Sequence, residues 1–309
     1  DIDSVKQKKF YQPMLAQNYE DRKGGLVFPL YCQPKLDGVR CIIRKEEGEV
    51  VAKTRNGRSI DTIPHIINKI KGFFLMYPDA ILDGELYNHK LKHDFNKIIS
   101  LVRKQKPVKS ASDTDNSFLK KERKFEASLE ESEELVEYWI YDAPNIADAK
   151  ESMLFSIRFA HLMAQFSECN YIEVVPTYEV FEEGHLDGIY QQQLEEGFEG
   201  QIVRVDTGYE NKRSKNLLKR KEFKDSEYVV IGIEEGDGNR VGTAKHLVCK
   251  DEKTNKTFNS NIKGTFEYLK EILDNKKEYI GKYATIKYFE LTPDGIPRFP
   301  YAMSFRDYE

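Results

Sequence analysis

The sequence predicts an α+β protein of two domains, in which a larger mixed domain is followed by a small β-barrel. The chain has 309 residues, and at about 150 residues per domain two domains are expected. The first two-thirds of the chain alternates strand-like and helix-like segments. The last 84 residues, from Ser226 on, hold several short strands and one helix. We therefore expect one domain over residues 1–224 and a second over residues 225–309.

The first domain is expected to open with a β-hairpin, in which residues 38–45 and 49–54 flank a glutamate- and glycine-containing turn. A helix is expected next, because Pro64 stands early in a segment whose isoleucines recur at helical spacing, at positions 63, 66, 67 and 70. Further strands are expected over residues 80–87, 136–142, 172–180 and 200–205, and a further helix over residues 94–104, with Asp94 near its start.

The clearest long helix is expected over residues 148–166. Its apolar side would consist of five residues: Met153, Leu154, Ile157, Ala160 and Ala164. In the second domain, strands are expected near residues 227–234, 244–250, 256–262 and 282–290, with a helix over residues 264–273. Several strands and one helix in this length fit a small barrel.

Composition excludes several classes of protein. Hydrophobic residues make up 39% of the chain and charged residues 32%, which is enough to bury a core and excludes a mainly disordered chain. The apolar stretches are too short to cross a membrane, and the charged start lacks the apolar core of a signal peptide. We expect a soluble cytoplasmic protein. The four cysteines show no metal-binding spacing and are expected to be reduced thiols.

One segment of the first domain has a segregated charge. Residues 103–124 hold eight lysines and arginines against three acids, and residues 126–137 hold six glutamates and no base. Two interpretations remain: a solvated loop followed by a polar helix, which we favour, or a clamp that binds nucleic acid.

The strongest local signal for chemistry is the segment Lys35-Leu36-Asp37-Gly38-Val39-Arg40, which follows an apolar run from Leu26 to Cys32. A lysine at the end of a strand has a fixed backbone and a projecting amine, which becomes a nucleophile once it is deprotonated. Taken alone, the segment is equally compatible with an ordinary Asp-Gly turn after a strand.

Four further segments follow in a characteristic order: Asp83-Gly84-Glu85, Tyr141-Asp142, Glu199-Gly200 and Leu217-Leu218-Lys219-Arg220-Lys221. Together with Lys35, this series resembles the covalent nucleotidyltransferase superfamily, which comprises ATP-dependent polynucleotide ligases and mRNA capping enzymes. The resemblance runs from Lys35 to Arg306. It implies a nucleotidyltransferase (adenylylation) domain of antiparallel sheets and helices, followed by an OB-fold domain.

The resemblance also implies catalytic roles. Lys35 would attack the α-phosphate of ATP and hold AMP through a covalent bond. Lys219 and Lys221 would contact that phosphate, and as neighbouring cations they would lower the pKa of Lys35. Glu85 and Glu199 would bind the ribose and a divalent metal, Mg²⁺ or Mn²⁺.

Other positions match residues that bind the nucleotide or position the reacting groups. Asp37 and Arg40 would lie near the reacting ends and the ribose, and Arg55 would touch nucleotide or 5′-phosphate. Tyr141 would stack on adenine, although its segment also fits an ordinary half-buried strand.

Three further positions are expected to contact ATP. Arg213 would contact phosphate. Gln33 stands where some ligases have a glutamate that contacts adenine. Arg298, which with Phe299, Pro300, Arg306 and Asp307 resembles the last ligase motif, would orient the departing pyrophosphate.

The form of these motifs favours an ATP-dependent DNA ligase of the minimal viral or phage type, located in the host cytoplasm in that case. Only 34 residues precede Lys35, so neither an NAD-recognition domain nor a large DNA-binding domain is expected. The expected substrate is nicked duplex DNA, and the expected state is a monomer. Alternatives within the superfamily are an RNA ligase and a GTP-using mRNA capping guanylyltransferase. Outside enzymes, the alternative is a non-catalytic nucleic-acid-binding protein.

Overall fold

The computed structural model describes residues 10–92, 94–167, 169–288 and 291–306. These residues form two compact units that divide between Arg220 and Lys221. The sequence-based boundary lies four residues later, between residues 224 and 225.

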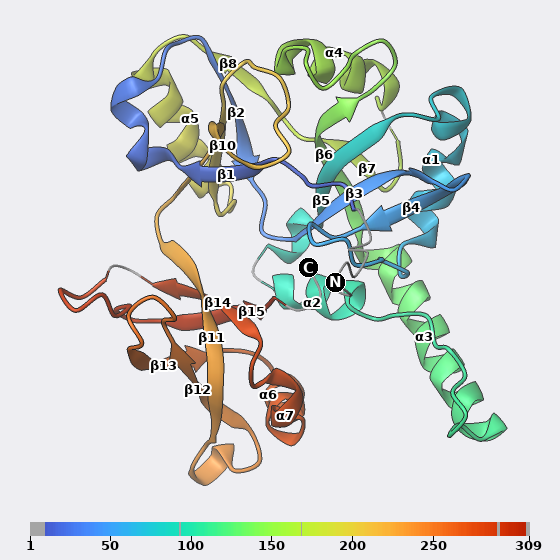
Figure 1. Cartoon of the computed structure of the whole chain (residues 1–309), viewed down its shortest axis with the longest axis vertical. Helices are drawn as coiled ribbons and strands as arrows, with labels where there is room; N and C mark the ends of the chain where they lie inside the picture. The colour runs from blue at the N-terminus through green and yellow to red at the C-terminus, as the bar shows by residue number, and fades with distance from the viewer. Residues whose placement is uncertain (1–9, 93, 168, 289–290, 307–309) are drawn as a thin grey trace, which may run out of the picture. The chain divides into compact units, whose positions relative to one another are not determined.

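The first unit contains two five-stranded sheets (Figure 1). The first sheet has the order β1 (Leu15–Asn18), β10 (Arg213–Lys221), β9 (Gly200–Arg204), β2 (Leu30–Lys35) and β8 (Tyr178–Val180). The second has the order β4 (Glu49–Lys53), β3 (Val39–Glu46), β5 (Ile81–Tyr87), β6 (Glu137–Asn145) and β7 (Ile172–Val174). Pairing is antiparallel in both sheets apart from β1 with β10 and β6 with β7, which run parallel.

Five helices accompany these sheets in the described part of the unit: α1 (Pro64–Met76), α2 (Phe95–Val102), α3 (Asp115–Leu135), α4 (Phe155–Gln165) and α5 (Glu183–Glu195). Short 3-10 turns, η1 (Tyr19–Asp21), η2 (Lys23–Gly25) and η3 (His89–Leu91), lie between strands and helices. The predicted hairpin, the α1 helix with Pro64 as its first residue, and the strand over residues 81–87 are confirmed.

Side chains alternate between the two faces of the first sheet, and one of these faces packs against α5. Leu30 and Cys32 of β2, Val203 of β9 and Leu218 of β10 point to one face, where they bury Leu186 and Ile189 of α5 in one cluster. On the opposite face, Leu217 packs with Met14, Tyr209 and Ile202. Each strand thus presents one set of side chains to the helix and leaves the other set to build a site.

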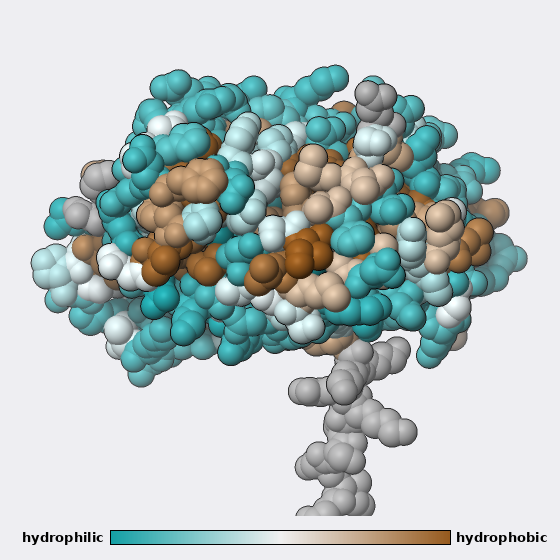
Figure 2. Space-filling view, turned by 90° about the horizontal axis from the view of Figure 1, so that it is seen from above, coloured by the Kyte–Doolittle hydropathy of each residue, from teal (hydrophilic) through white to brown (hydrophobic). Residues whose placement is uncertain are grey.

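The prediction for the helix over residues 148–166 is wrong in both extent and orientation. The helix begins only at Phe155, and Met153, Leu154, Ile157, Ala160 and Ala164 are all exposed. Figure 2, which views the end of the unit that carries α4, shows apolar groups exposed among hydrophilic ones. The buried side instead contains Phe155, Phe159 and Leu162, together with Arg158, whose guanidinium pairs with buried Asp142 of β6. The helix therefore buries a second apolar set of its sequence, next to a buried ion pair.

The predicted strand over residues 172–180 is two short strands, β7 and β8, which belong to different sheets. The intervening residues 175–177 include Pro176, which cannot donate a ladder hydrogen bond. The charged segment over residues 103–137 contains an exposed loop and the long polar helix α3, and both interpretations of this segment are compatible with these elements.

The second unit is a closed barrel of order β11 (Lys224–Glu235), β12 (Ala244–Lys250), β13 (Thr257–Ile262), β15 (Tyr301–Phe305) and β14 (Tyr283–Tyr288). It also holds η4 (Gly238–Arg240), α6 (Phe266–Asp274) and α7 (Lys276–Tyr279). The four predicted strands and the helix are confirmed, except that residues 289 and 290 lie outside the described residues. The fifth strand, β15, was not predicted, because residues 298–306 were interpreted only as a phosphate-binding motif.

The cysteines and the membrane prediction can also be compared with the structure. All four cysteines are free thiols, and Cys32, Cys41 and Cys249 are buried, as expected. Among the described residues, none of the helices has the length and apolarity that a membrane span requires.

Candidate active site

Strand pairing in the first sheet brings Lys35 against Glu199. Lys35 is the last residue of β2 and pairs with Gly200, the first residue of β9, so Glu199 arrives beside the lysine. The Lys35 Nζ donates to Glu199 Oε2 at 2.7 Å, and the side chains are 20% and 11% exposed. The two residues are separated by 164 positions in the sequence. The sequence predicted both residues, and the sheet register explains why they meet.

The turn after Lys35 carries the chain from the first sheet into the second. A Cβ on Gly38 would lie 2.2 Å from the carbonyl oxygen of Leu86 and 3.0 Å from Cγ of Glu85, so only glycine permits this approach to β5. On the other side of β5, a Cβ on Gly84 would lie 2.4 Å from the carbonyl oxygen of Trp139. These two glycines allow β2, β5 and β6 to bring Lys35, Glu85 and Tyr141 together, with Asp37 in the turn.

Glu85 lies on β5 opposite Arg40 of β3 and Trp139 of β6. Tyr141 donates a long hydrogen bond of 3.5 Å to Glu85 Oε1. Burial raises the pKa of Glu85 to about 7, although Arg40 and Lys35 act in the opposite direction. A cation placed next to this buried carboxylate would stabilise its charged form.

Glu85 and Glu199 are suited to hold Mg²⁺ or Mn²⁺. Mg²⁺ is usually bound by one or two carboxylates while it keeps waters or substrate phosphates, so two glutamates can suffice as its protein ligands. The described residues contain no group of three or more acidic, histidine or cysteine side chains that could hold a metal by themselves. The donor set thus fits a metal shared with a phosphate substrate.

The pKa of Lys35 does not follow the sequence-based expectation. Burial disfavours the charged ammonium, but Glu199, Asp37 and Glu85 outweigh burial, so the pKa of Lys35 is raised. We expected neighbouring lysines to lower it, and in this structure the net direction is the opposite. The surrounding carboxylates therefore favour the charged form of the Lys35 amine, which has no lone pair with which to attack.

Gln33 is buried beneath the site with its side chain fully engaged. Its Nε2 donates to the carbonyl oxygen of Tyr141 at 3.0 Å and to Thr177 Oγ1 at 2.9 Å. Its Oε1 accepts from Arg204 Nε at 2.7 Å. These bonds use both amide hydrogens, so Gln33 supports the backbone of Tyr141.

A buried charge network that the sequence reasoning missed lies next to Gln33. Asp142 accepts from the guanidinium groups of Arg158 and Arg204, with N···O distances of 3.0 Å, and all three side chains are at most 4% exposed. Arg204 also lies over the ring of Tyr141, 5.6 Å from its centroid. The Asp that follows Tyr141 was visible in the sequence, but its two arginine partners were not.

Arg40 is engaged by a second buried carboxylate. Its guanidinium makes two hydrogen bonds of 2.7 Å to Asp83 and lies over Tyr141, 5.2 Å from the ring centroid. Asp83 also accepts from the hydroxyl of Tyr209 at 2.7 Å. The two guanidinium groups of Arg40 and Arg204 thus help to fix the ring of Tyr141.

Because side chains alternate along β10, its basic residues lie on different faces of the sheet. Leu217 packs with Ile202 on the face of the sheet that carries Lys35, and Lys219, two residues on, points to the same face. Arg220 points to the other face, where it pairs with Asp187 at 2.7 Å and lies between the rings of Tyr19 and Tyr190. The sequence-based choice of Lys219 over Arg220 therefore agrees with the alternation of the strand.

The remaining predicted residues lie at the ends of β10 and in the barrel. Arg213, the first residue of β10, is exposed and donates to the carbonyl oxygen of Ala16 at 2.6 Å. Lys221, the last, belongs to the second unit and pairs with Asp225. Arg298 is exposed on the loop before β15, next to Phe299, which is 82% exposed. Asp307 lies outside the described residues.

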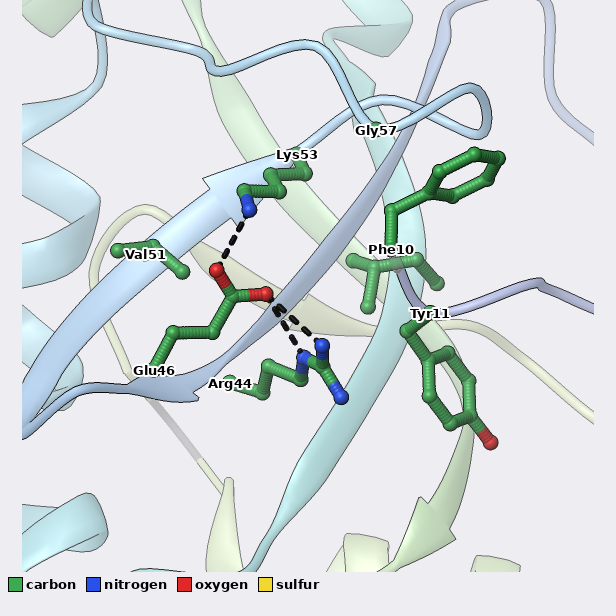
Figure 3. Close-up of a pocket in the computed structure, with 8 residues that line it drawn as sticks. Phe10, Tyr11, Arg44, Glu46, Val51, Lys53 and Gly57 are labelled. Carbon is green, nitrogen blue, oxygen red and sulfur yellow. Dashed lines mark hydrogen bonds and ion pairs between the residues drawn. The ribbon is translucent and has the colours of Figure 1, made fainter. Parts of the chain in front are cut away.

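Arg55 lies on the turn after β4. Gly57 of the same turn lines a small pocket (Figure 3). In this pocket Glu46 accepts from Lys53 at 2.5 Å and from Arg44 at 2.9 and 3.0 Å, so the charges compensate one another. The ring of Phe10 covers Gly57, where a Cβ would lie 2.6 Å from the ring. Lys35 does not line this pocket. Phe10, which does, packs against the turn that carries Arg55.

An aromatic group, also missed from the sequence, holds the loop that leads to Glu199. His89 lies between Tyr87, whose hydroxyl is 2.7 Å from Nδ1, and the carbonyl oxygen of Glu196, 2.9 Å from Nε2. Its ring stacks on Phe198 with centroids 4.1 Å apart. Because Phe198 precedes Glu199 directly, this packing restrains the carboxylate that faces Lys35.

Comparison with known proteins is consistent with this geometry. The model of the ATP dependent DNA ligase domain matches residues 13–221, and that of the DNA ligase OB-like domain matches residues 235–306. The DNA ligase of African swine fever virus is 24% identical over 300 residues, which cover 89% of this chain and 63% of the viral protein. The DNA ligase of Haemophilus influenzae is 26% identical over 271 residues, covering 86% and 82%.

Among solved structures, a mycobacterial DNA ligase D complexed with ATP and MES matches with a TM-score of 0.58 and 16% identity, covering 96% of this chain and 95% of that one. At this identity the likeness concerns the fold. The chain spans less than two thirds of the length of the swine fever virus relatives.

Proposed function

Because the chain belongs to the family of ATP-dependent DNA ligase domains, we propose that it seals nicks in duplex DNA with ATP through a covalent lysyl-AMP on Lys35. One observation carries the proposal. The amine of Lys35 lies 2.7 Å from Glu199 where the two sheets meet, and Glu85 and Tyr141 lie beside it. A lysine amine, carboxylates and an aromatic ring thus lie close together, which supports Lys35 as the nucleophile.

In the first step, the unprotonated Nζ of Lys35 attacks the α-phosphorus of ATP. A phosphorus–nitrogen bond forms, the bond from that phosphorus to its bridging oxygen breaks, and pyrophosphate leaves with the electron pair. The proton of the amine passes to water, which the 20% exposure of the side chain allows. AMP then passes to the 5′-phosphate of the nick, and the adjacent 3′-hydroxyl displaces it.

The chain supports this reaction mainly by positioning and charge. Lys219 shares the face of Lys35, and with Lys221 it would bind the α-phosphate. A divalent metal on Glu85 and Glu199 would supply positive charge next to the phosphates. The withdrawal of the Glu199 charge from Lys35 would lower the pKa of the amine and free its lone pair.

The other predicted residues have supporting roles in this proposal. Tyr141 would stack on the adenine, while Gln33 holds its backbone carbonyl and Arg40 lies over its ring. Arg213 and Arg55 would contact phosphate. Arg298, on its exposed loop, would orient the pyrophosphate, and Asp37 would act next to the reacting amine.

The barrel offers a surface for DNA. Lys287 lies over the rings of Phe223 and Tyr301, at 4.9 and 5.9 Å, and Lys263 lies 4.9 Å from the ring of Tyr301. Lysines next to partly buried aromatic rings, as here, would suit contacts to a nucleic-acid backbone. We propose nicked duplex DNA as the partner and a cytoplasmic monomer as the working unit.

The test uses the full chain with Mg²⁺ and labelled ATP. We expect label on the protein that Lys35→Ala abolishes and that Lys150→Ala, at an exposed lysine away from the site, leaves intact. We also expect the sealing of a 5′-phosphorylated nick in duplex DNA with ATP and not with NAD.

Two outcomes would redirect the proposal. Labelling by GTP in place of ATP would assign the chain to the capping guanylyltransferases, and sealing of RNA alone would assign it to the RNA ligases. Label that survives Lys35→Ala would overturn the assignment of the nucleophile.

A further inference from the structure

The C-terminal half of helix α3 makes polar contacts to the rest of the unit. The hydroxyl of Ser128 accepts from Lys104 at 2.8 Å, and Glu131, Glu133 and the carbonyl oxygen of Leu135 also have partners outside the helix. Ser128 and Ser132 are the buried residues of the helix. Figure 1 shows α3, in green, running out from the sheets of the first unit.

The N-terminal half of α3 extends beyond these contacts. Its polar contacts are with its own preceding loop, where Lys121 pairs with Asp113 and Lys109 pairs with Asp115. Thr114 caps the helix by accepting from the backbone N–H of Ser117. With a rise of about 1.5 Å per residue, the half from Asp115 to Ala127 extends for about 20 Å.

Three cations lie together on the outer side of this projecting half. Lys120, Arg123 and Lys124 stand three and four positions apart, so they share one face of the helix, and all three are exposed. None of them forms an ion pair with a described residue. The partly buried Phe118 and Phe125 lie on the opposite face of the helix.

Helix stability does not account for this cluster. Like charges at positions i and i+4, such as Lys120 and Lys124, destabilise a helix, and no acid stands three or four positions from either lysine. The last turn carries Glu133 and Glu134 and no base, which is also unfavourable for the helix dipole. The cationic face destabilises the helix. An anionic partner outside the chain would account for its presence.

We propose that the face of α3 formed by Lys120, Arg123 and Lys124 binds the phosphate backbone of the duplex on one side of the nick. This inference rests on the proposed function for its substrate. Phosphate contacts of this kind orient a protein on DNA without reading its sequence. A duplex is favoured over a single strand because the cluster offers no exposed aromatic ring on which bases could stack.

The experiment measures binding of the full chain to a nicked, 5′-phosphorylated duplex at salt concentrations between about 50 and 200 mM, in EDTA and without ATP. Lys120, Arg123 and Lys124 are replaced together by alanine. The matched control replaces Lys69, Lys71 and Lys150, also exposed, and so changes the net charge equally. Both variants are assayed separately for lysyl-AMP formation, which neither is expected to change.

The α3 variant should bind more weakly than the control, and its log–log salt slope should be shallower by about 2.7, for three phosphates released. Its affinity deficit should therefore shrink by about 40-fold between about 50 and 200 mM salt. A charge-preserving variant, Lys120→Arg with Arg123→Lys and Lys124→Arg, should bind like the wild type.

Equal slopes for the α3 variant, the control and the wild type would overturn the inference, even if lysyl-AMP forms normally. Loss of binding in the charge-preserving variant would also overturn it, because the effect would then come from helix structure. Failure of the wild type to form lysyl-AMP would instead refute the proposed function.

Discussion

The ion pair between Lys35 and Glu199 has a consequence that a single substitution can measure. Glu199→Gln keeps the shape of the side chain and removes its charge. Glu199 is the main group that raises the pKa of Lys35 against the effect of burial. We therefore expect a larger fraction of Lys35 to be neutral at any pH below its pKa.

The size of the effect follows from the 2.7 Å hydrogen bond between the two charged groups. A hydrogen bond to a charged group contributes about 1.5–3 kcal/mol, and each 1.36 kcal/mol is a factor of ten in the fraction of neutral amine. Both side chains are mostly buried, so solvent screening is limited. The neutral fraction of Lys35 should rise by about ten- to a hundredfold.

The assay is competitive acylation of lysines across pH in EDTA, with the Lys35 peptide quantified by mass spectrometry. Glu196→Gln is the matched control, because that exposed side chain contacts Gln192 and not Lys35. If the labelling curves of the Glu199→Gln variant and the wild type coincide, the ion pair does not control the lysine. We also expect slower lysyl-AMP formation in the variant with Mg²⁺, because the same change removes a proposed metal ligand.

Three further predictions concern the supports of the site. Asp142→Asn should lower the free energy of unfolding by about 3–5 kcal/mol in urea titrations, since two arginines would lose their buried partner; a loss below about 1 kcal/mol would contradict this. Gly38→Ala should slow lysyl-AMP formation by about a hundredfold by displacing β5, whereas Gly72→Ala, in an open position of α1, should stabilise the fold by about 0.5–1 kcal/mol; equal activities would refute the argument. Burial raises the pKa of Glu85 from 4.5 to about 7, so protonation of Glu85 stabilises the folded state relative to the unfolded state. In EDTA this contribution, up to about 3 kcal/mol, is fully present below pH 4.5 and is lost as the pH rises through 7. Glu85→Gln should remove that pH dependence, and parallel stability curves for the variant and the wild type would refute it.

Local features of the sequence were sufficient for most elements and motifs. The hairpin of β3 and β4, the start of α1 at Pro64 and the barrel strand β12 follow from short patterns of turns and apolar residues. The order of the motifs identified Lys35, Glu85 and Glu199 as members of one site. These features depend on neighbouring residues or on motif order, which the sequence contains directly.

The partners and charge states of the site were decided by tertiary contacts. Helix α4 buries Phe155, Phe159 and Leu162 beside the pair of Arg158 and Asp142, so the sequence held two apolar sets and only the tertiary structure shows which one is buried. The two guanidinium groups on Tyr141 come from β3 and β9, which lie far apart in the sequence. The raised pKa of Lys35 follows from Glu199 and Glu85, which the sheets bring to it, and from Asp37 in the adjacent turn. Electrostatic energies depend on distances and burial in space, and neither quantity can be obtained from the order of residues in the chain.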